Sequence, residues 1–284
     1  MPYKRKTTVT RRKRKAYKKA PSKFRASVPR TLQIATKRNS RMTLKFVTNQ
    51  TYLFHPASTA FPAGQTSLLC FRANSIYQSQ LPVSNVVGVW KSQNPAKYSN
   101  DVVAGVQQNA DGWDEWTSRF QHFCVTGSRI SATFEPVTSG APSIMTTHVS
   151  GIQGAVNNLT TSARLNELPY TKRASIVVNT NLSSPIGQSL SATYSARKFE
   201  GVTDPNDNSN LRGRFATTTT PTLPGNTPSE QSFFYLAMSP IDPNTVDPMP
   251  QGVVRVKIEY VVQLKEPTDT NQIQLATGTR TGEL

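Results

Sequence analysis

The chain has 284 residues, 36% of them hydrophobic, and a formal net charge of +17 at pH 7. All of this excess lies in the first forty-five residues, which carry seventeen Lys and Arg and no Asp or Glu, whereas residues 46–284 balance sixteen basic against sixteen acidic residues. No stretch approaches eighteen consecutive apolar residues and no hydrophobic segment follows the N-terminal charges. We therefore expect neither a transmembrane span nor a secretory signal, and a soluble protein made in the cytosol.

Residues 1–45 are predicted to form a disordered basic arm that binds nucleic acid. The arm has too few apolar residues to offset its ordering entropy by burial. Clustered Lys and Arg displace condensed counterions from phosphates without needing a folded surface. Tyr3, Tyr17 and Phe24, which lie among the charges, are candidates for stacking on bases. The predicted nucleic-acid-binding residues are Lys4, Arg5, Lys6, Arg11, Arg12, Lys13, Arg14, Lys15, Lys18, Lys19, Lys23 and Arg25.

The same arm could have partners other than nucleic acid. Residues 1–19 offer too few apolar side chains for an amphipathic helix, so no membrane insertion is expected. The clusters at residues 4–6 and 11–15 also fit a nuclear address read by a host import receptor, which is compatible with nucleic-acid binding. An organellar transit peptide and a solvated charge run without a partner are the remaining alternatives.

Residues 46–284 are predicted to form one all-β domain, a single eight-stranded jelly-roll sandwich. Asp111-Gly112 is the only tight hairpin signal, so the connections are long, which favours a double-sheet jelly roll over an up-and-down barrel. A break in the alternation at Gly127-Ser128 indicates a β-bulge. Alternating apolar and polar residues indicate strands at residues 43–54, 66–77, 123–134, 143–152, 174–178, 190–199, 232–238 and 253–264.

Two short helices are expected in the connections. The first covers residues 112–122, with Asp111 as N-cap and Trp113, Trp116 and Phe120 on one face. The second covers residues 157–168 and is ended by Pro169. We expect the two tryptophans to pack against the sandwich or a neighbouring subunit, with stacking on bases as the alternative.

No convergent catalytic set is present, so we predict that the chain is not an enzyme and needs no metal or cofactor. The histidines have no HxxxH, CxxC or HExxH companions, and no nucleophile elbow, Walker loop or dinucleotide fingerprint occurs. The loop containing Asp204 and Asn208 has the odd spacing of a calcium loop but lacks its glycine and its final glutamate. Cys70 and Cys124 lie in apolar segments and are expected to be buried free thiols.

The body also carries a resemblance to a known family. Asp111-Gly112-Trp113-Asp114-Glu115-Trp116, then Phe120, Phe123, Val125, Gly127-Ser128 and Ile130, resembles capsid proteins of small circular, Rep-encoding (circovirus-like) single-stranded DNA viruses. Looser matches lie at residues 167–172, 194–201 and 255–260. The resemblance implies a single jelly roll, a T=1 icosahedral shell of sixty copies, and an inward-facing arm that contacts the genome and carries a nuclear localisation signal. The arm departs from the family by mixing Lys with Arg and by its scattered Thr and Tyr.

We therefore predict a viral capsid protein that self-assembles into a small icosahedral shell and packages single-stranded DNA through its arm, with the virion and, during assembly, the host nucleus as its locations. Sixty arms of +17 would supply about 1,000 positive charges, enough to neutralise on the order of 1,000 nucleotides. The alternatives are a cellular nucleic-acid-binding protein of ribosomal or chromatin type, the coat protein of a small RNA virus, and a β-sandwich hydrolase or lectin with a basic tail.

Overall fold

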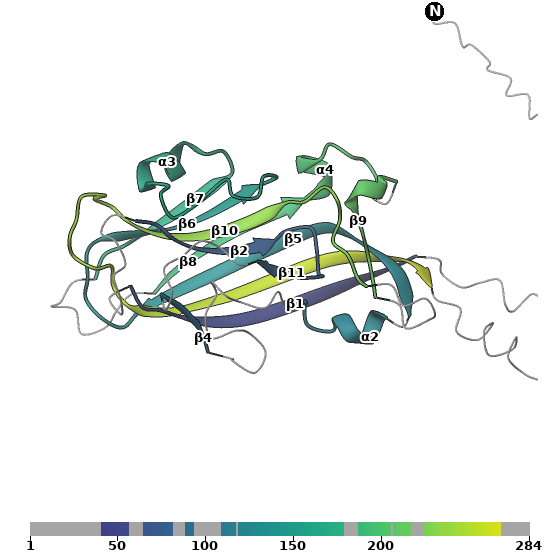
Figure 1. Ribbon diagram of the computed structural model, residues 1–284, viewed down its shortest axis with the longest axis horizontal. Coiled ribbons are helices and arrows are strands. Elements are labelled where there is room, and N and C mark those ends of the chain that lie inside the picture. The colour runs from purple at the N-terminus through teal and green to yellow at the C-terminus, as the bar shows by residue number, and fades with distance from the viewer. Residues whose placement is uncertain are drawn as a thin grey trace, which may run out of the picture. The chain divides into compact units, whose positions relative to one another are not determined.

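The computed structural model describes residues 41–56, 65–81, 89–93, 109–117, 119–178, 187–205, 207–216 and 224–267. Two antiparallel sheets pack face to face in this part of the chain (Figure 1). The strands are β1 (Arg41–Phe54), β2 (Ser67–Arg72), β3 (Gln80–Leu81), β4 (Trp90–Ser92), β5 (Phe120–Pro136), β6 (Ser143–Ser150), β7 (Thr171–Ile176), β8 (Gln188–Ser195), β9 (Arg212–Arg214), β10 (Phe233–Pro240) and β11 (Gly252–Pro267). The helices are α2 (Trp113–Thr117), α3 (Ser162–Glu167), α4 (Ala196–Phe199) and the 3₁₀ turn η1 (Ser209–Leu211).

The order of the strands is that of a jelly roll. Sheet A runs β4-β1-β11-β5-β8, with β9 also paired to β5, and sheet B runs β3-β2-β10-β6-β7. Among the eight long strands, taken in chain order, the first pairs with the eighth, the second with the seventh, the third with the sixth and the fourth with the fifth. This nested pairing is a long antiparallel hairpin rolled into two sheets, so the predicted fold class is confirmed.

The main core lies between the two sheets. In β11 the even-numbered residues from Val254 to Leu264 are buried, and the odd-numbered residues between them face away from the core. Large aromatic side chains fill the space between the sheets; Phe54, for example, lies 4.7 Å from Trp90 and 6.2 Å from Phe134, measured between ring centroids. The inner faces of both sheets therefore share one hydrophobic cluster.

Sheet B is also covered on its outer face. Leu68, Cys70, Phe233 and Tyr235 point away from the main core and form a second buried cluster with Val156 and Leu165. Val156 and Leu165 belong to residues 151–168, which include α3 and lie over this sheet (Figure 1). Both faces of the central strands of sheet B are consequently buried, and β2 and β10 consist of buried residues throughout.

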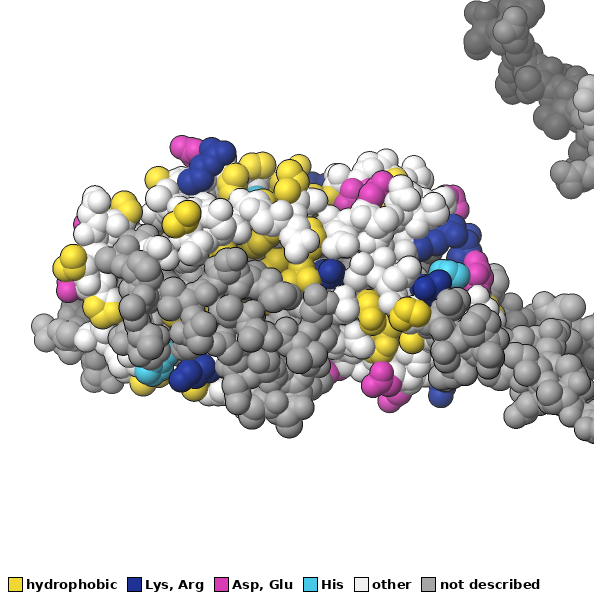
Figure 2. Space-filling view, viewed as in Figure 1, with side chains coloured by type: hydrophobic (Ala, Val, Ile, Leu, Met, Phe, Trp, Pro, Cys, Tyr) yellow, Lys and Arg dark blue, Asp and Glu magenta, His cyan; other side chains and the backbone are white. Residues whose placement is uncertain are grey.

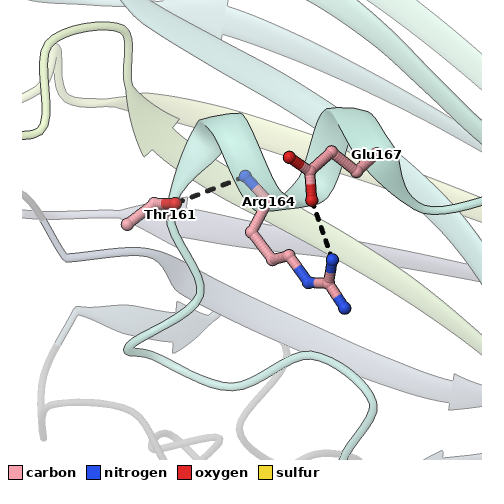
Figure 3. Close-up of polar contacts among 3 residues, drawn as sticks. All are labelled: Thr161, Arg164 and Glu167. Carbon is pink, nitrogen blue, oxygen red and sulfur yellow. Dashed lines mark hydrogen bonds and ion pairs between the residues drawn. The ribbon is translucent and has the colours of Figure 1, made fainter.

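Helix α3 is held by local polar contacts. The Thr161 side chain accepts a hydrogen bond from the Arg164 backbone N–H at 3.3 Å and so caps the helix (Figure 3). One turn on, the Arg164 guanidinium contacts the Glu167 carboxylate at 2.7 Å. Both side chains of this ion pair are about two-thirds exposed, so the buried Leu165 anchors the helix more strongly than the pair does.

The eight predicted strands correspond one to one to the eight long strands, with differences at their ends. The predicted strand at residues 190–199 ends at Ser195 and continues as α4. The predicted helix at residues 112–122 is only the five residues of α2, because Phe120 onward pairs with β11 and β9. The helix predicted at residues 157–168 is the six residues of α3. Three strands of two or three residues, β3, β4 and β9, were not predicted.

Two local predictions, the β-bulge and the start of α2, agree with the structure to within one residue. The β-bulge lies in β5 at Thr126, where Val261 pairs with Gly127 and Val262 pairs with Val125. The turn before α2 contains Gly112 at φ +82°, a conformation that favours glycine. Gly112 directly precedes the helix, so the predicted N-cap Asp111 was one residue too early.

Strand β1 begins before the predicted start of the shell domain at residue 46. Arg41 pairs with Lys265, and Lys45 pairs with Val261. The last five residues of the segment predicted as an arm are thus the first five residues of the sheet. Residues 1–40, including the predicted disorder there, lie outside the described residues.

Candidate nucleic-acid interface

Sheet A presents a strongly basic outer face. Directly paired residues of neighbouring strands point to the same side of a sheet, so the register places the outward side chains of β1, β4, β5, β9 and β11 on one surface. Among the described residues the register places two carboxylates on this surface, Glu135 and Glu259, against nine cations, and two more, Asp204 and Glu266, reach its edge by contacts with Arg41 and His122. We call it the basic face; its cations are Arg41, Lys45, Lys91, Arg129, Arg212, Arg214, Arg255, Lys257 and Lys265.

Both carboxylates of the basic face are engaged by its own cations. Glu259 contacts the Lys45 Nζ at 2.7 Å and the Lys257 Nζ at 3.1 Å, and these hydrogen bonds lower the pKa of Glu259 to about 2. Glu135 forms an ion pair with Arg255. Even with Asp204 and Glu266 counted, four carboxylates cannot balance nine cations, so the face retains a net positive charge that would attract a polyanion.

The charge is densest at one end of the sheet. One row across β1, β11, β5 and β9 reads Arg41, Lys265, His122 and Arg214. The next outward row reads Thr43, Gln263, Cys124 and Arg212. Figure 2 shows Lys and Arg side chains gathered at the end of the sandwich where Figure 1 places β9.

Strand β9 can lie against β5 because its central residue is Gly213. A Cβ atom on this residue would collide with the ring of Phe123, whose side chain is fully buried. The glycine therefore lets Arg212 and Arg214, on either side of it, join the basic face beside His122. His122 in turn lies 3.1 Å from the Glu266 carboxylate, measured from Nδ1 to Oε2.

A polar cavity of about 450 Å³ lies at the same end. Inside it the Arg41 Nη1 lies 3.3 Å from the Asp204 Oδ2. The cavity is formed by the start of β1, the bulge of β5, the end of β11, the first turn of α4 and the loop that follows α4. Its lining residues are Arg41, Thr43, Thr126, Arg197, Thr203, Asp204, Pro205 and Gln263.

The binding residues that the sequence predicted do not belong to the basic face. All twelve Lys and Arg named between residues 4 and 25, and the stacking candidates Tyr3, Tyr17 and Phe24, lie outside the described residues. Trp113 is buried, with its ring 4.5 Å from Phe215 and 5.5 Å from Phe123. Its packing is therefore confirmed and base stacking by Trp113 is wrong. Trp116 is half-buried beside Phe120, and the Arg119 guanidinium lies 5.2 Å from its ring.

The basic face was missed because the sequence of residues 46–284 is neutral in sum. A usable signal was present in β11, where Arg255, Lys257 and Lys265 occupy odd, outward positions while the even positions are apolar. Arg212 and Arg214 carry the same spacing of two. Their segment lies between the strands predicted at residues 190–199 and 232–238, so no surface shared with β11 was predicted for them.

Both cysteines are buried free thiols, as predicted. Burial raises the pKa of Cys70 to about 12. Burial likewise raises the pKa of Cys124 to about 12, with Arg212 opposing this shift and Asp204 adding to it, so these two charged groups act on the outward side of β5. In the part of the chain that the structure describes, no group of three His, Cys, Asp or Glu could hold a metal ion, and no helix could cross a membrane.

No protein-family model matches the chain, and no curated protein matches it. Solved virus structures are similar to it at low identity. Tobacco necrosis virus has 11% identity and a TM-score of 0.41, over 83% of this chain and 87% of that one. Mud crab tombus-like virus has 10% and 0.38, over 84% and 98%. The T=3 Penaeus vannamei nodavirus has 8% and 0.39, over 95% and 66%. Likeness at this level does not assign a family or a function.

Proposed function

We propose that the chain is the coat-protein subunit of a small icosahedral virus shell of about sixty copies, and that it packages single-stranded nucleic acid. The observation that carries this proposal is the segregation of charge on a jelly roll. Nine cations lie on one face of sheet A. Strand β1, which belongs to this sheet, directly follows residues 1–40, which contain fifteen Lys and Arg and no Asp or Glu. Shell formation would bring many such faces and arms around one polyanion.

The charge also sets the orientation of the subunit in the proposed shell. A nucleic acid is attracted by positive potential, so sheet A and the segment before β1 would face the interior. The outer face of sheet B is instead covered by residues 151–168 and is largely apolar beneath them. The shell domain would therefore start at β1, and residues 1–40 would be the genome-binding arm.

The resemblance to circovirus-like capsids does not specify the kind of genome. The residues that carry the resemblance to circovirus-like capsids have packing roles here: Trp113 and Ile130 are in the core, Gly112 allows the turn and Gly127 adjoins the bulge. These roles serve a jelly roll with any genome. The residues that carry the resemblance therefore do not distinguish a single-stranded DNA virus from a small RNA virus, and the proposed function includes both genomes.

A cellular nucleic-acid-binding protein is the alternative from another class. The basic face of sheet A also suits such a protein, because it places cations on the folded surface. The size of the assembly separates the two functions. Nuclear import through the clusters at residues 4–6 and 11–15 stays a prediction, tested by the location of a fluorescent fusion with and without these residues.

Analytical ultracentrifugation of the purified full chain tests the proposed function. We expect megadalton particles that contain nuclease-protected nucleic acid, and whose contents are identified as DNA or RNA by digestion with DNase or RNase after disruption. A chain that remains a monomer or small oligomer with and without added nucleic acid would overturn the coat-protein function. Particles that assemble but never contain nucleic acid would overturn the packaging function alone.

A further inference from the structure

We propose that the cavity at the start of β1 is a binding pocket for a backbone phosphate of the packaged nucleic acid, held by Arg41 and Arg197. This inference rests on the proposed function, since it assigns a site on the folded body to the same polyanion. The pocket lies where the described chain begins, directly after the basic segment of residues 1–40. Its described lining comes from β1, β5, β11, α4 and the following loop.

The lining has the donors that a phosphate needs. Arg41 and Arg197 present guanidinium groups, whose planar arrangement of N–H donors matches two phosphate oxygens at once. Thr43, Thr203 and Gln263 add uncharged donors around them. Asp204 is the one carboxylate among the eight lining residues, so the pocket carries a net positive charge.

The bulge in β5 contributes to the shape of the pocket. Thr126 is the extra residue of β5, and its Oγ1 donates a hydrogen bond to the Val261 carbonyl at 3.2 Å. This bond fixes the hydroxyl at the wall of the cavity. The volume of about 450 Å³ exceeds that of a bare phosphate and falls in the range of small-ligand sites, so the sugar of a nucleotide can enter with its phosphate.

The Asp204 carboxylate contacts the Arg41 guanidinium, the group to which the phosphate would bind. Its Oδ2 lies 3.3 Å from the Arg41 Nη1, with side chains that are 38% and 48% exposed. A pair this exposed is weak, and a phosphate with more charge and more acceptor oxygens can displace the carboxylate from Arg41. Removing the negative charge of Asp204 should consequently strengthen phosphate binding, whereas a merely structural ion pair would give no such gain.

The neighbouring basic groups extend the pocket into a track. Arg212 and Lys265 lie on the outward rows that contain Thr43 and Arg41. A strand of nucleic acid bound at the pocket would therefore meet further cations along β9 and β11. Because the basic segment of residues 1–40 joins the pocket covalently, both can bind one strand, and each raises the effective concentration of the other.

The test compares full-length variants in binding a fluorescein-labelled twelve-nucleotide oligo-dT, followed by anisotropy from 50 to 300 mM NaCl. The test variant is the pair R41Q/R197Q. Its matched control is R164Q/R173Q, which removes the same charge from exposed arginines of α3 and β7. We expect the test pair to bind about 3- to 10-fold more weakly than the control at the lowest salt. The slope of log K against log[NaCl] should fall by about 0.7, the loss of one phosphate contact.

Asp204→Asn supplies a second, opposite readout, for which we expect binding tighter than wild type. Wild type that binds while R41Q/R197Q matches the control in affinity and slope would overturn the pocket and leave the proposed function standing. Failure of every protein, wild type included, to bind would overturn the packaging function, while the coat-protein function depends on assembly. If R41Q/R197Q weakens particle assembly without changing the salt slope, the cavity is a contact between subunits and the phosphate site is overturned.

Discussion

Trp113, the first residue of α2, packs against aromatic side chains from three other segments of the chain. Its ring lies 4.5 Å from Phe215, 5.1 Å from Tyr77 and 5.5 Å from Phe123. Trp113→Ala would leave a large cavity among these rings, and we expect it to lower the free energy of unfolding by roughly 3–5 kcal/mol. Urea unfolding of dissociated subunits measures this loss.

The matched control is Trp116→Ala, three residues along the same helix. Trp116 is only half-buried, so its loss should cost clearly less than that of Trp113. Sequence periodicity placed both tryptophans on one face and could not rank them, because the rank depends on Phe215 and Tyr77 arriving from distant segments. Equal losses for the two variants would contradict the greater burial of Trp113.

His148 provides a pH dependence with a defined sign. Its side chain is 4% exposed, with its Nδ1 3.0 Å from the Thr171 Oγ1, and burial lowers its pKa below the usual 6.5, opposed by a hydrogen bond with the Pro169 carbonyl. The unfolded chain therefore binds this proton more readily than the folded chain does. Stability should be complete above about pH 6.5 and fall as the pH decreases below it.

We expect the urea midpoint of wild type to drop between pH 7.5 and pH 5.5 by more than that of His148→Gln, which cannot titrate in this range. The comparison cancels the carboxylates, which titrate in both proteins. A wild type and variant with parallel pH profiles would show that His148 does not contribute.

At the scale of elements, alternation predicts a strand when the strand is long and has one face in the core. The five apolar residues from Val254 to Val262 gave the position of β11 directly, and the same argument located the other seven long strands. Strands β3, β4 and β9 have two or three residues, too few for a period to show. Ala196 and Phe199 fit a strand or a helix equally, and contact with Tyr170 and Tyr194 favours α4.

Helix α3 tests whether the cover of sheet B is needed for stability. Leu165→Ala removes a buried side chain from the second cluster and should cost about 2–5 kcal/mol. Thr161→Ala removes only the cap and should cost about 0.5–2 kcal/mol. Arg164→Ala breaks an exposed ion pair and should cost less than about 1 kcal/mol. Thermal or urea unfolding that reversed this order would contradict the anchoring role of Leu165.

Over the whole molecule, the sequence shows how much charge the chain carries but not where the folded chain places it. Residues 46–284 sum to zero, yet register brings Arg129, Arg212, Arg255 and Lys265 to one face. A sum over sequence positions contains no information about pairing between strands 50 or more residues apart. The predicted boundary at residue 46 followed the charge and left residues 41–45 in the arm, although the strand predicted at residues 43–54 already overlapped them; their partners are residues 261–265.

This boundary decides how the arm should be removed. Deleting residues 1–40 leaves β1 whole and should give a folded body that assembles with little or no nucleic acid. Deleting residues 1–45 also removes five residues of pairing with β11, so it should lower the stability of the subunit as well. Absorbance at 260 and 280 nm measures the contents of the particles, and unfolding of their subunits measures stability. Particles of the shorter deletion that held nucleic acid at the wild-type level would contradict the role of the arm.

The last prediction concerns access to the basic segment before and after assembly. Lys and Arg recur from Lys4 to Arg38, and trypsin cleaves after them wherever the backbone is accessible. In the free subunit we expect cleavage in this segment first, because Lys and Arg are densest there, whereas the cations of β1, β5 and β11 belong to paired strands. In a closed shell with the basic face inward, the same bonds lie behind the shell and should be cut only after dissociation. Mass spectrometry of timed digests follows both states. If intact particles lost the segment as fast as free subunits, it would lie outside the shell, and sheet A could not be the face that meets the genome.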